Sequence, residues 1–363
     1  MIFLDVGPSA KLSNIALTSF LRRADQRMRL GFFDRVTNAS FYMVLMSKAV
    51  LKGTILASCV LLVCGSGCSI KRLAVNQVGN ALAAGGTTFS SDDDPELVRA
   101  AVPFSLKLME SLLAETPKHR GLLKAASSGF VQYAYAFVQQ DADELEDSDL
   151  AAATALRARA KRLYLRARDY GLRGLEVGRP GFRCRFYANP HNTMLSMKKS
   201  DVPFLYWTAV SWAAAISLSK DDPQLLAEIP LMEALIDRAL ELDEGYGQGA
   251  IHSFLITYEM SRQGAAGDAA ERSKMHFERA IELSKGTLAG PLVAYAEAVC
   301  VQKQDLNTFR QLLGQALALN ADSWPEHRLE NLVMQRRARW LLSKESDLFL
   351  IPEKPDSDSS RNR

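Results

Sequence analysis

The sequence predicts an all-α protein of tetratricopeptide-like helix hairpins, an α-solenoid or bundle, placed after a signal peptide and a tether. Three observations support this fold class. Apolar residues recur every three to four positions from residue 95 onward, glycine and proline fall between most periodic segments, and an alanine-containing motif returns along the C-terminal half. With 48% apolar residues among 363, the chain can also bury a large core.

The charge balance excludes one class of partner. Lysine and arginine total 44 and aspartate and glutamate total 41, which leaves a net charge of +3. Charges that nearly cancel give no field for holding phosphate backbones, so nucleic acid is not expected as a partner.

Residues 46–67 have the order of a secretory signal, with Lys48 and Lys52 before an apolar run from Ile55 to Cys64. The run has about half of the roughly 20 residues that a membrane-spanning helix needs. The small residues at 66–67 directly before Cys68 resemble the lipobox of bacterial lipoproteins, although Gly65 stands where that pattern prefers leucine. We therefore expect Cys68 to be lipidated and to become the first mature residue, anchoring the protein without spanning the bilayer. A plain secretory signal and a buried thiol are the alternatives.

The segments around this signal are predicted from composition. Residues 1–45 contain five arginines, which indicates a mis-called N-terminal extension from a start codon placed too early; an amphipathic leader is the alternative. Residues 68–94 are expected to form the lipid anchor and a tether, with one short helix near 71–84. Residues 351–363 are polar and charged and are expected to be a disordered tail.

The helical domain is predicted to cover residues 95–350. Its first hairpin begins at Pro95, turns at Pro117 and is followed by the acidic stretch 141–149, expected to be a solvated loop, and a third helix over 156–170. Later helices are predicted at about 203–219, 230–242, 247–262, 269–285, 290–302, 305–319 and 326–344.

A weak internal repeat runs through the later helices. Ala239, Ala280 and Ala316 open similar motifs, offset by 41 (280 minus 239) and 36 (316 minus 280) residues. These offsets lie near the tetratricopeptide period of about 34 residues, and each motif is expected to end the second helix of a hairpin. An irregular helical bundle is the alternative.

No catalytic or metal-binding motif is found in the sequence, so we expect neither an enzyme nor a cofactor beyond the lipid on Cys68. Each of the five histidines is expected to be a surface or capping residue. Cys184 and Cys300 are predicted to be unpaired buried thiols, with one long-range disulfide as the alternative. A third hypothesis is an envelope hydrolase that uses Cys184 with His191.

The segment 204–216 is apolar on every face, so it must be covered all round or line a cavity. Its Tyr206, Trp207 and Trp212 are predicted to form the aromatic wall of an apolar ligand pocket or channel; a central packing helix is the alternative. The loop predicted before this helix carries several basic residues, namely Arg183, Arg185, His191, Lys198 and Lys199. We interpret it as a solvated basic loop; the alternative is that these side chains attract an anionic ligand.

From about residue 61 to 350 the chain resembles the TatT family, lipoproteins associated with tripartite ATP-independent periplasmic (TRAP) transporters. The resemblance is carried by Ser-Gly-Cys-Ser-Ile-Lys at 66–71, Leu-Tyr-Leu-Arg-Ala-Arg-Asp-Tyr at 163–170 and Asp-Val-Pro-Phe-Leu-Tyr-Trp-Thr-Ala at 201–209. The segments 212–223, 276–284 and 335–342 extend it.

The resemblance implies a lipid-anchored periplasmic protein that pairs with the substrate-binding subunit of a TRAP system and passes a small organic or hydrophobic ligand to it. It also implies self-association, with a trimer as one expected state. Ser69 after the anchor favours the outer membrane. The alternative function is an envelope scaffold whose hairpin grooves bind another protein and no ligand.

Overall fold

Helices account for all regular structure in the residues that the computed structural model describes, 75–82 and 88–350. This confirms the all-α fold class, and the helix at 75–82 matches the short one predicted near 71–84. Within these two ranges, no helix is both long enough and apolar enough to span a bilayer. The predicted extension (1–45), signal (46–67), lipidated Cys68 and tail (351–363) lie outside the described residues.

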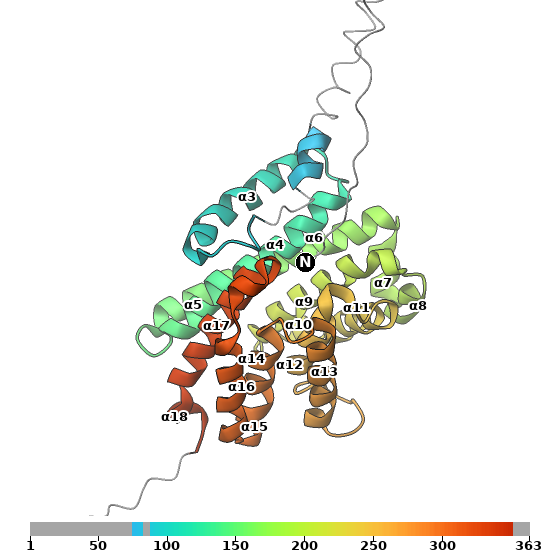
Figure 1. Ribbon diagram of the computed structural model, residues 1–363. Helices are drawn as coiled ribbons and strands as arrows, with labels where there is room; N and C mark the ends of the chain where they lie inside the picture. Colours follow the sequence, from blue (N-terminus) through green and yellow to red (C-terminus); the bar gives the residue numbers. More distant parts are fainter. Residues whose placement is uncertain (1–74, 83–87, 351–363) are drawn as a thin grey trace, which may run out of the picture. The chain divides into compact units, whose positions relative to one another are not determined.

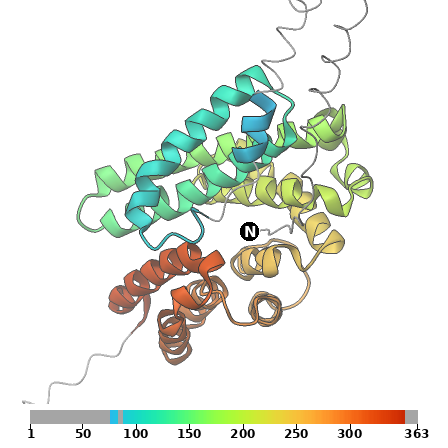
Figure 2. The same cartoon turned by 45° about the horizontal axis from the view of Figure 1, so that its top comes forward.

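A first group of helices packs around the larger of two hydrophobic cores. Helices α4, α6, α9 and α11 lie side by side in that order, and α3 covers α4 (Figures 1 and 2). The helices of this group are α3 (Pro95–Glu115), α4 (Arg120–Ala134), α5 (Gln140–Leu145), α6 (Leu150–Gly178), α7 (Phe182–Ala188), α8 (Pro190–Leu195), α9 (Val202–Ser217), α10 (Pro223–Leu226) and α11 (Ile229–Leu242).

The second group follows as packed helices, with α12 against α13, α14 against α16, and α17 against both α14 and α16. Ile251 and Leu255 of α12 still belong to the larger core, whereas α14, α16 and α17 enclose the smaller one. In Figures 1 and 2 these orange and red helices gather on one side of the first group. They are α12 (Ala250–Tyr258), α13 (Ala269–Ser284), α14 (Gly290–Tyr295), α15 (Val301–Lys303), α16 (Leu306–Ala318), α17 (Arg328–Ser343) and α18 (Glu345–Leu348).

Local sequence signals explain several of these boundaries. The side chain of Asp94 accepts hydrogen bonds from the backbone N–H groups of Glu96 and Leu97, and Pro95 occupies the first turn of α3 as predicted. The repeat alanines Ala239, Ala280 and Ala316 lie near the ends of α11, α13 and α16, and all three are fully buried. Their burial fits the close helix contacts expected from the repeat, while the tetratricopeptide period stays a prediction.

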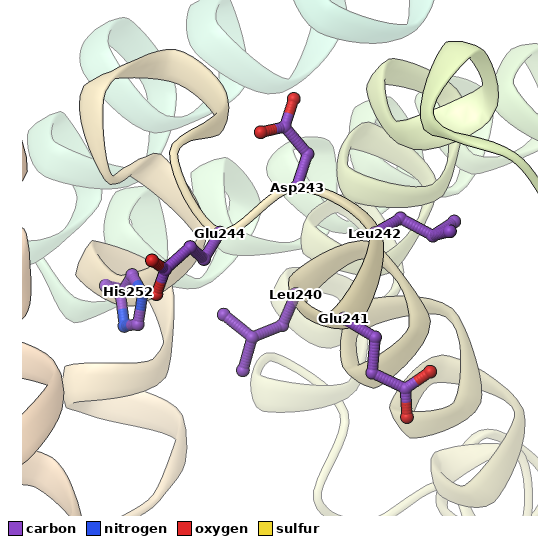
Figure 3. Close-up of a pocket in the computed structure, with 6 residues that line it drawn as sticks. All are labelled: Leu240, Glu241, Leu242, Asp243, Glu244 and His252. Atoms are coloured by element: carbon purple, nitrogen blue, oxygen red, sulfur yellow. Dashed lines mark ion pairs between the residues drawn. The ribbon is translucent and has the colours of Figure 1, made fainter.

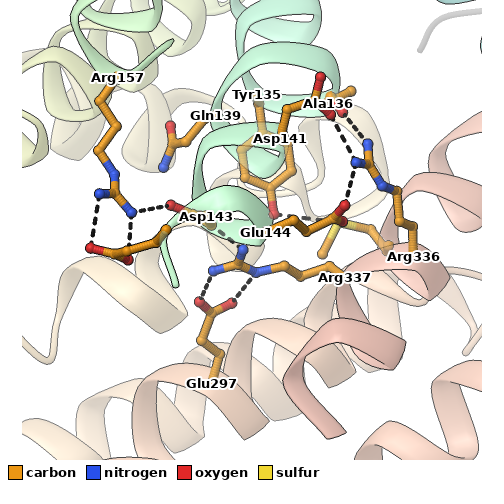
Figure 4. Close-up of polar contacts among 12 residues, drawn as sticks. Tyr135, Ala136, Gln139, Asp141, Asp143, Glu144, Arg157, Glu297, Arg336 and Arg337 are labelled. Atoms are coloured by element: carbon orange, nitrogen blue, oxygen red, sulfur yellow. Dashed lines mark hydrogen bonds and ion pairs between the residues drawn. The ribbon is translucent and has the colours of Figure 1, made fainter. Parts of the chain in front are cut away.

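An ion-pair network joins the two groups (Figure 4). Arg337 of α17 bridges Asp143 of α5, at 2.8 Å, and Glu297, while the neighbouring Arg336 contacts Asp141 at 2.8 Å and Glu144 at 2.6 Å. The acidic stretch 141–149 was predicted to be a solvated loop, and that prediction is wrong for 141–145, whereas 146–149 do form an exposed turn. Its first residues are helical and their carboxylates are neutralised by arginines almost 200 positions away.

Two π-helical segments flank this network. Tyr135–Gln139 precedes α5, Ala296–Cys300 precedes α15, and Glu297 itself lies within the second segment. A π-helical turn widens the helix by one residue and so changes the direction of the side chains around it. The carboxylates of Asp143 and Glu297 thereby meet on the guanidinium of Arg337, which is only 10% exposed.

Candidate functional site

Helix α9 is the predicted aromatic segment, and it lies at the centre of the first group between α4, α6 and α11. The close approach of α6 depends on Gly171 and Gly174, where a Cβ atom would overlap Thr208 and Phe204 of α9. Neighbours on three sides explain why the helix has no polar face.

The N-terminal end of α9 is held by a buried carboxylate. Asp201 is 4% exposed, and its carboxylate forms ion pairs with Arg120 at 3.2 Å and with Arg179 at 2.7 Å. Burial alone would raise the pKa of Asp201, but Arg179, the backbone N–H of Lys198 and Arg120 together hold it below its usual value. The carboxylate therefore stays charged and fixes the start of the helix.

Two of the three predicted aromatic residues join a cluster with a third ring. Tyr206 packs edge-to-face on Trp207, with ring centroids 4.9 Å apart, and lies 5.3 Å from the ring of Tyr246. Tyr246 comes from the short 3₁₀ turn Tyr246–Gln248 after α11. We call Tyr206, Trp207 and Tyr246 the aromatic cluster.

Burial dominates the electrostatics of the aromatic cluster. It raises the pKa of Tyr206, and it raises that of Tyr246 to about 12 although a hydrogen bond from Trp207 acts in the opposite direction. Both tyrosines are therefore neutral at physiological pH.

Trp212, the third predicted aromatic residue, lies apart from the aromatic cluster in the core. Its side chain is fully buried, its indole N–H donates to Glu228 at 2.8 Å, and the guanidinium of Arg168 lies 4.8 Å from its ring centroid. These contacts match the packing alternative for this residue. Tyr246, by contrast, was not predicted, because nothing near Gly245 and Gly247 in the sequence shows that this turn packs on α9.

A carboxylate of the second group of helices affects the pKa of Tyr206. The negative charge of Glu330, at the start of α17, is one of the causes that raise the pKa of Tyr206, after burial and Tyr246. The Glu330 carboxylate lies 3.9 Å from Nδ1 of His327. Neither residue was predicted, because they lie more than 100 positions from α9.

The basic segment before α9 is more ordered than predicted. Residues 182–195 form α7 and α8 instead of a loop, since Phe182 and Phe186 are one helical turn apart and both are fully buried. Cys184 lies between them on the opposite face. It is therefore exposed, and its predicted burial is wrong, whereas Cys300 is buried; both are unpaired as expected.

Two of the basic side chains in this segment are neutralised by carboxylates. Arg183 contacts Asp169 at 2.7 Å, and Lys199 contacts Asp243 at 3.1 Å. Side chains that already have carboxylate partners give little attraction to an anionic ligand, which agrees with the interpretation of this segment as a solvated surface.

The histidines only partly follow the expectation of surface or capping roles. His119 caps α4 by accepting from the N–H of Leu122, and His191 is exposed. His252 and His327 are buried, and for these two the prediction is wrong. His252 has a partner on the next helix, since its Nδ1 lies 2.8 Å from Nδ1 of His276 on α13.

His252 also lines an open pocket at the end of α11 (Figure 3). The other lining residues are Leu240, Glu241, Leu242, Asp243 and Glu244. The acidic members have basic partners, including Arg279 for Glu244. Across the described ranges, no three His, Cys, Asp or Glu side chains gather in a way that could hold a metal ion.

A family model described as TRAP transporter T-component matches residues 91–349, which is most of the chain. The chain belongs to the TRAP transporter T-component family. The matched range contains both cores, the aromatic cluster and Glu330. Cys68 precedes the matched range.

One relative in this comparison comes from Treponema pallidum (strain Nichols) and is described as an uncharacterized protein. It is 30% identical over 312 residues, which cover 81% of this chain and 96% of the relative. The T-component family consists of accessory proteins of a transport system. The resemblance found in the sequence is therefore confirmed at the level of the family.

Proposed function

We propose that this T-component docks the periplasmic substrate-binding subunit of its TRAP system and aids uptake of a small organic or hydrophobic ligand at the aromatic cluster. The observation that carries the ligand role is the cluster itself. Three rings meet between α9 and the turn after α11. Aromatic walls with a few well-placed polar groups are typical of sites for small organic ligands.

We further propose that the protein is held at the periplasmic side of the envelope, with the outer membrane favoured, by lipid on Cys68. The signal-like order of residues 46–67 and the small residues at 66–67 support this proposal. Labelled palmitate is expected to enter the wild-type protein and not the Cys68→Ser variant. Equal labelling of the two proteins would rule out Cys68 as the attachment site.

Solute uptake by cells that depend on this T-component tests the ligand role. Trp207→Ala is expected to lower uptake at least severalfold, because it opens the wall of the aromatic cluster while Trp212 still holds α9 in the core. Trp324→Ala is the matched control, since Trp324 is an exposed tryptophan in the second group.

Folding and assembly are checked in the same strains by circular dichroism and by co-purification with the substrate-binding subunit. Unchanged uptake by Trp207→Ala, with the complex intact, would favour the alternative of an envelope scaffold that binds no ligand.

A further inference from the structure

Helix α3 carries an apolar patch on its exposed face. Leu97 is 58% exposed and Phe104 is 74% exposed, which makes Phe104 the most exposed aromatic side chain in the described part of the chain. Seven positions separate the two residues (104 minus 97), so both side chains lie on one face of the helix, about 10 Å apart along its axis. Ala100 lies between them and is also exposed. We call Leu97, Ala100 and Phe104 the α3 patch.

The other face of α3 holds the helix in the protein. Val98, Leu106 and Leu113 are buried there and belong to the larger core. The position of α3 therefore does not depend on the α3 patch, whose large side chains leave apolar area in contact with water. Apolar area that the fold does not use is available for contact with another molecule.

A lysine borders the α3 patch. Lys107, one turn after Phe104, is 67% exposed and contacts the Glu110 carboxylate at 2.7 Å, and the same carboxylate contacts Arg166 at 2.5 Å. One carboxylate shared by two cations leaves a positive charge beside the patch. An apolar surface with a lysine at its margin fits the interface of a bilayer, where apolar groups enter the acyl region and the ammonium reaches the phosphates.

The short helix 75–82 limits how far the proposed lipid anchor can lie from α3. This helix packs on the start of α4, directly after α3 ends, since a Cβ atom on Gly79 would be 3.0 Å from Leu122 and 3.1 Å from His119. Figures 1 and 2 show it in blue beside α3. Cys68 precedes it by seven residues (75 minus 68), which span at most about 25 Å. Lipid on Cys68 would therefore hold the C-terminal end of α3 close to the bilayer.

We propose that α3 lies along the surface of the phospholipid membrane to which Cys68 is anchored, with Leu97 and Phe104 inserted at the boundary of the acyl chains. This inference rests on the proposed anchor and adds the orientation of the protein on the membrane. Two side chains bury too little apolar area to hold a protein on a bilayer alone. The anchor makes their contact with lipid intramolecular, so a weak contact is enough.

Tryptophan fluorescence tests this contact in the full-length protein, produced in a bacterium that processes lipoproteins and reconstituted into vesicles of phosphatidylethanolamine with a minor share of phosphatidylglycerol. Phe104→Trp places an indole in the α3 patch and changes only an exposed side chain. We expect the emission that this variant gains over the wild type to fall at least twofold when the acyl chains are brominated, because bromine there quenches an indole that reaches the acyl region.

Met275→Trp is the matched control. Met275 is 62% exposed on α13, on the side of the molecule away from α3 in Figures 1 and 2. Its added emission should be the same in brominated and unbrominated vesicles. Flotation of the vesicles, measured in parallel for each protein, shows whether the chain is bound to the membrane at all.

Equal quenching of the two variants, or an unquenched Phe104→Trp protein that floats with the vesicles, would overturn the contact of α3 with lipid and leave the anchor in place. Protein that does not float would overturn both, and the palmitate test on Cys68 checks the anchor separately. A wild type that sediments as an oligomer and a Phe104→Ser variant that sediments as a monomer, with Phe104→Trp unquenched, would instead assign the α3 patch to an interface between copies of this chain.

Discussion

At the scale of single residues, glycine determines how closely α6 and α9 approach. Gly174 is fully enclosed by the interface, and a Cβ atom there would overlap the ring of Phe204. Alanine is the better helix former by about 1 kcal/mol, but overpacking a core costs about 1–3 kcal/mol. The steric cost is therefore larger than the gain in helix propensity at this position.

Gly174→Ala is expected to lower the free energy of unfolding by about 1–2 kcal/mol, measured by urea denaturation. Gly314→Ala is the matched control, because Gly314 lies inside α16 with no atom within 4 Å of its would-be Cβ. That substitution should raise the free energy of unfolding by about 0.5–1 kcal/mol. A stabilised Gly174→Ala would contradict the close contact of α6 with α9.

The sequence pattern alone could not distinguish an aromatic residue that packs in the core from one that belongs to the candidate site. Trp207 and Trp212 are five positions apart in a helix with no polar face, so their sequence context is nearly the same. In the structure, Glu228 and Arg168 contact Trp212. Trp207 instead packs on Tyr206, which also contacts Tyr246. These partners lie 16 to 44 positions from the tryptophans, beyond the reach of helical periodicity.

At the scale of elements, α12 and α13 are joined by a buried histidine pair. The two Nδ1 atoms of His252 and His276 are 2.8 Å apart, so one imidazole donates and the other accepts. Burial lowers the pKa of both residues, and that of His276 falls to about 4 with His252 as the next cause. The surrounding charges are Glu244 and Arg279 near His252, and Glu259, Arg262 and Arg272 near His276.

This pair predicts a loss of stability in mild acid. The folded pKa of His276 lies below the unfolded value of about 6.5, so the unfolded chain binds more protons between about pH 6.5 and pH 4. The free energy of unfolding should therefore fall as the pH falls through this window, by about 1–2 kcal/mol from this residue after allowance for solvent screening.

Urea denaturation at several pH values measures the effect. His276→Gln should flatten the dependence between pH 6.5 and pH 4, whereas His191→Gln, on an exposed histidine, should leave the wild-type slope. An equal slope in His276→Gln and the wild type would show that the pair does not couple α12 to α13.

Periodicity and punctuation predicted most helices to within a few residues. The segment predicted at 230–242 is α11 at Ile229–Leu242, and the one at 269–285 is α13 at Ala269–Ser284. The acidic stretch was misjudged because a run of acidic residues indicates a solvated loop when no basic partner can be identified in the sequence. Its partners, Arg336 and Arg337, come from a helix that is adjacent only after the chain has folded.

At the scale of the whole molecule, the chain is an accessory component of a TRAP transport system built from two groups of helices. The family match covers the helical groups, and the ion-pair network around Arg337 connects the first group to the second. The fold class and the family could be predicted from the sequence, whereas the composition of the aromatic cluster required the packing of the turn after α11 on α9.

The central claim is that this T-component docks a substrate-binding subunit, and sedimentation of the purified full-length protein with the substrate-binding subunit of the same TRAP system tests it most directly. The account predicts a faster-sedimenting complex that contains both proteins. Two independent species at micromolar concentrations, each sedimenting as it does alone, would contradict it.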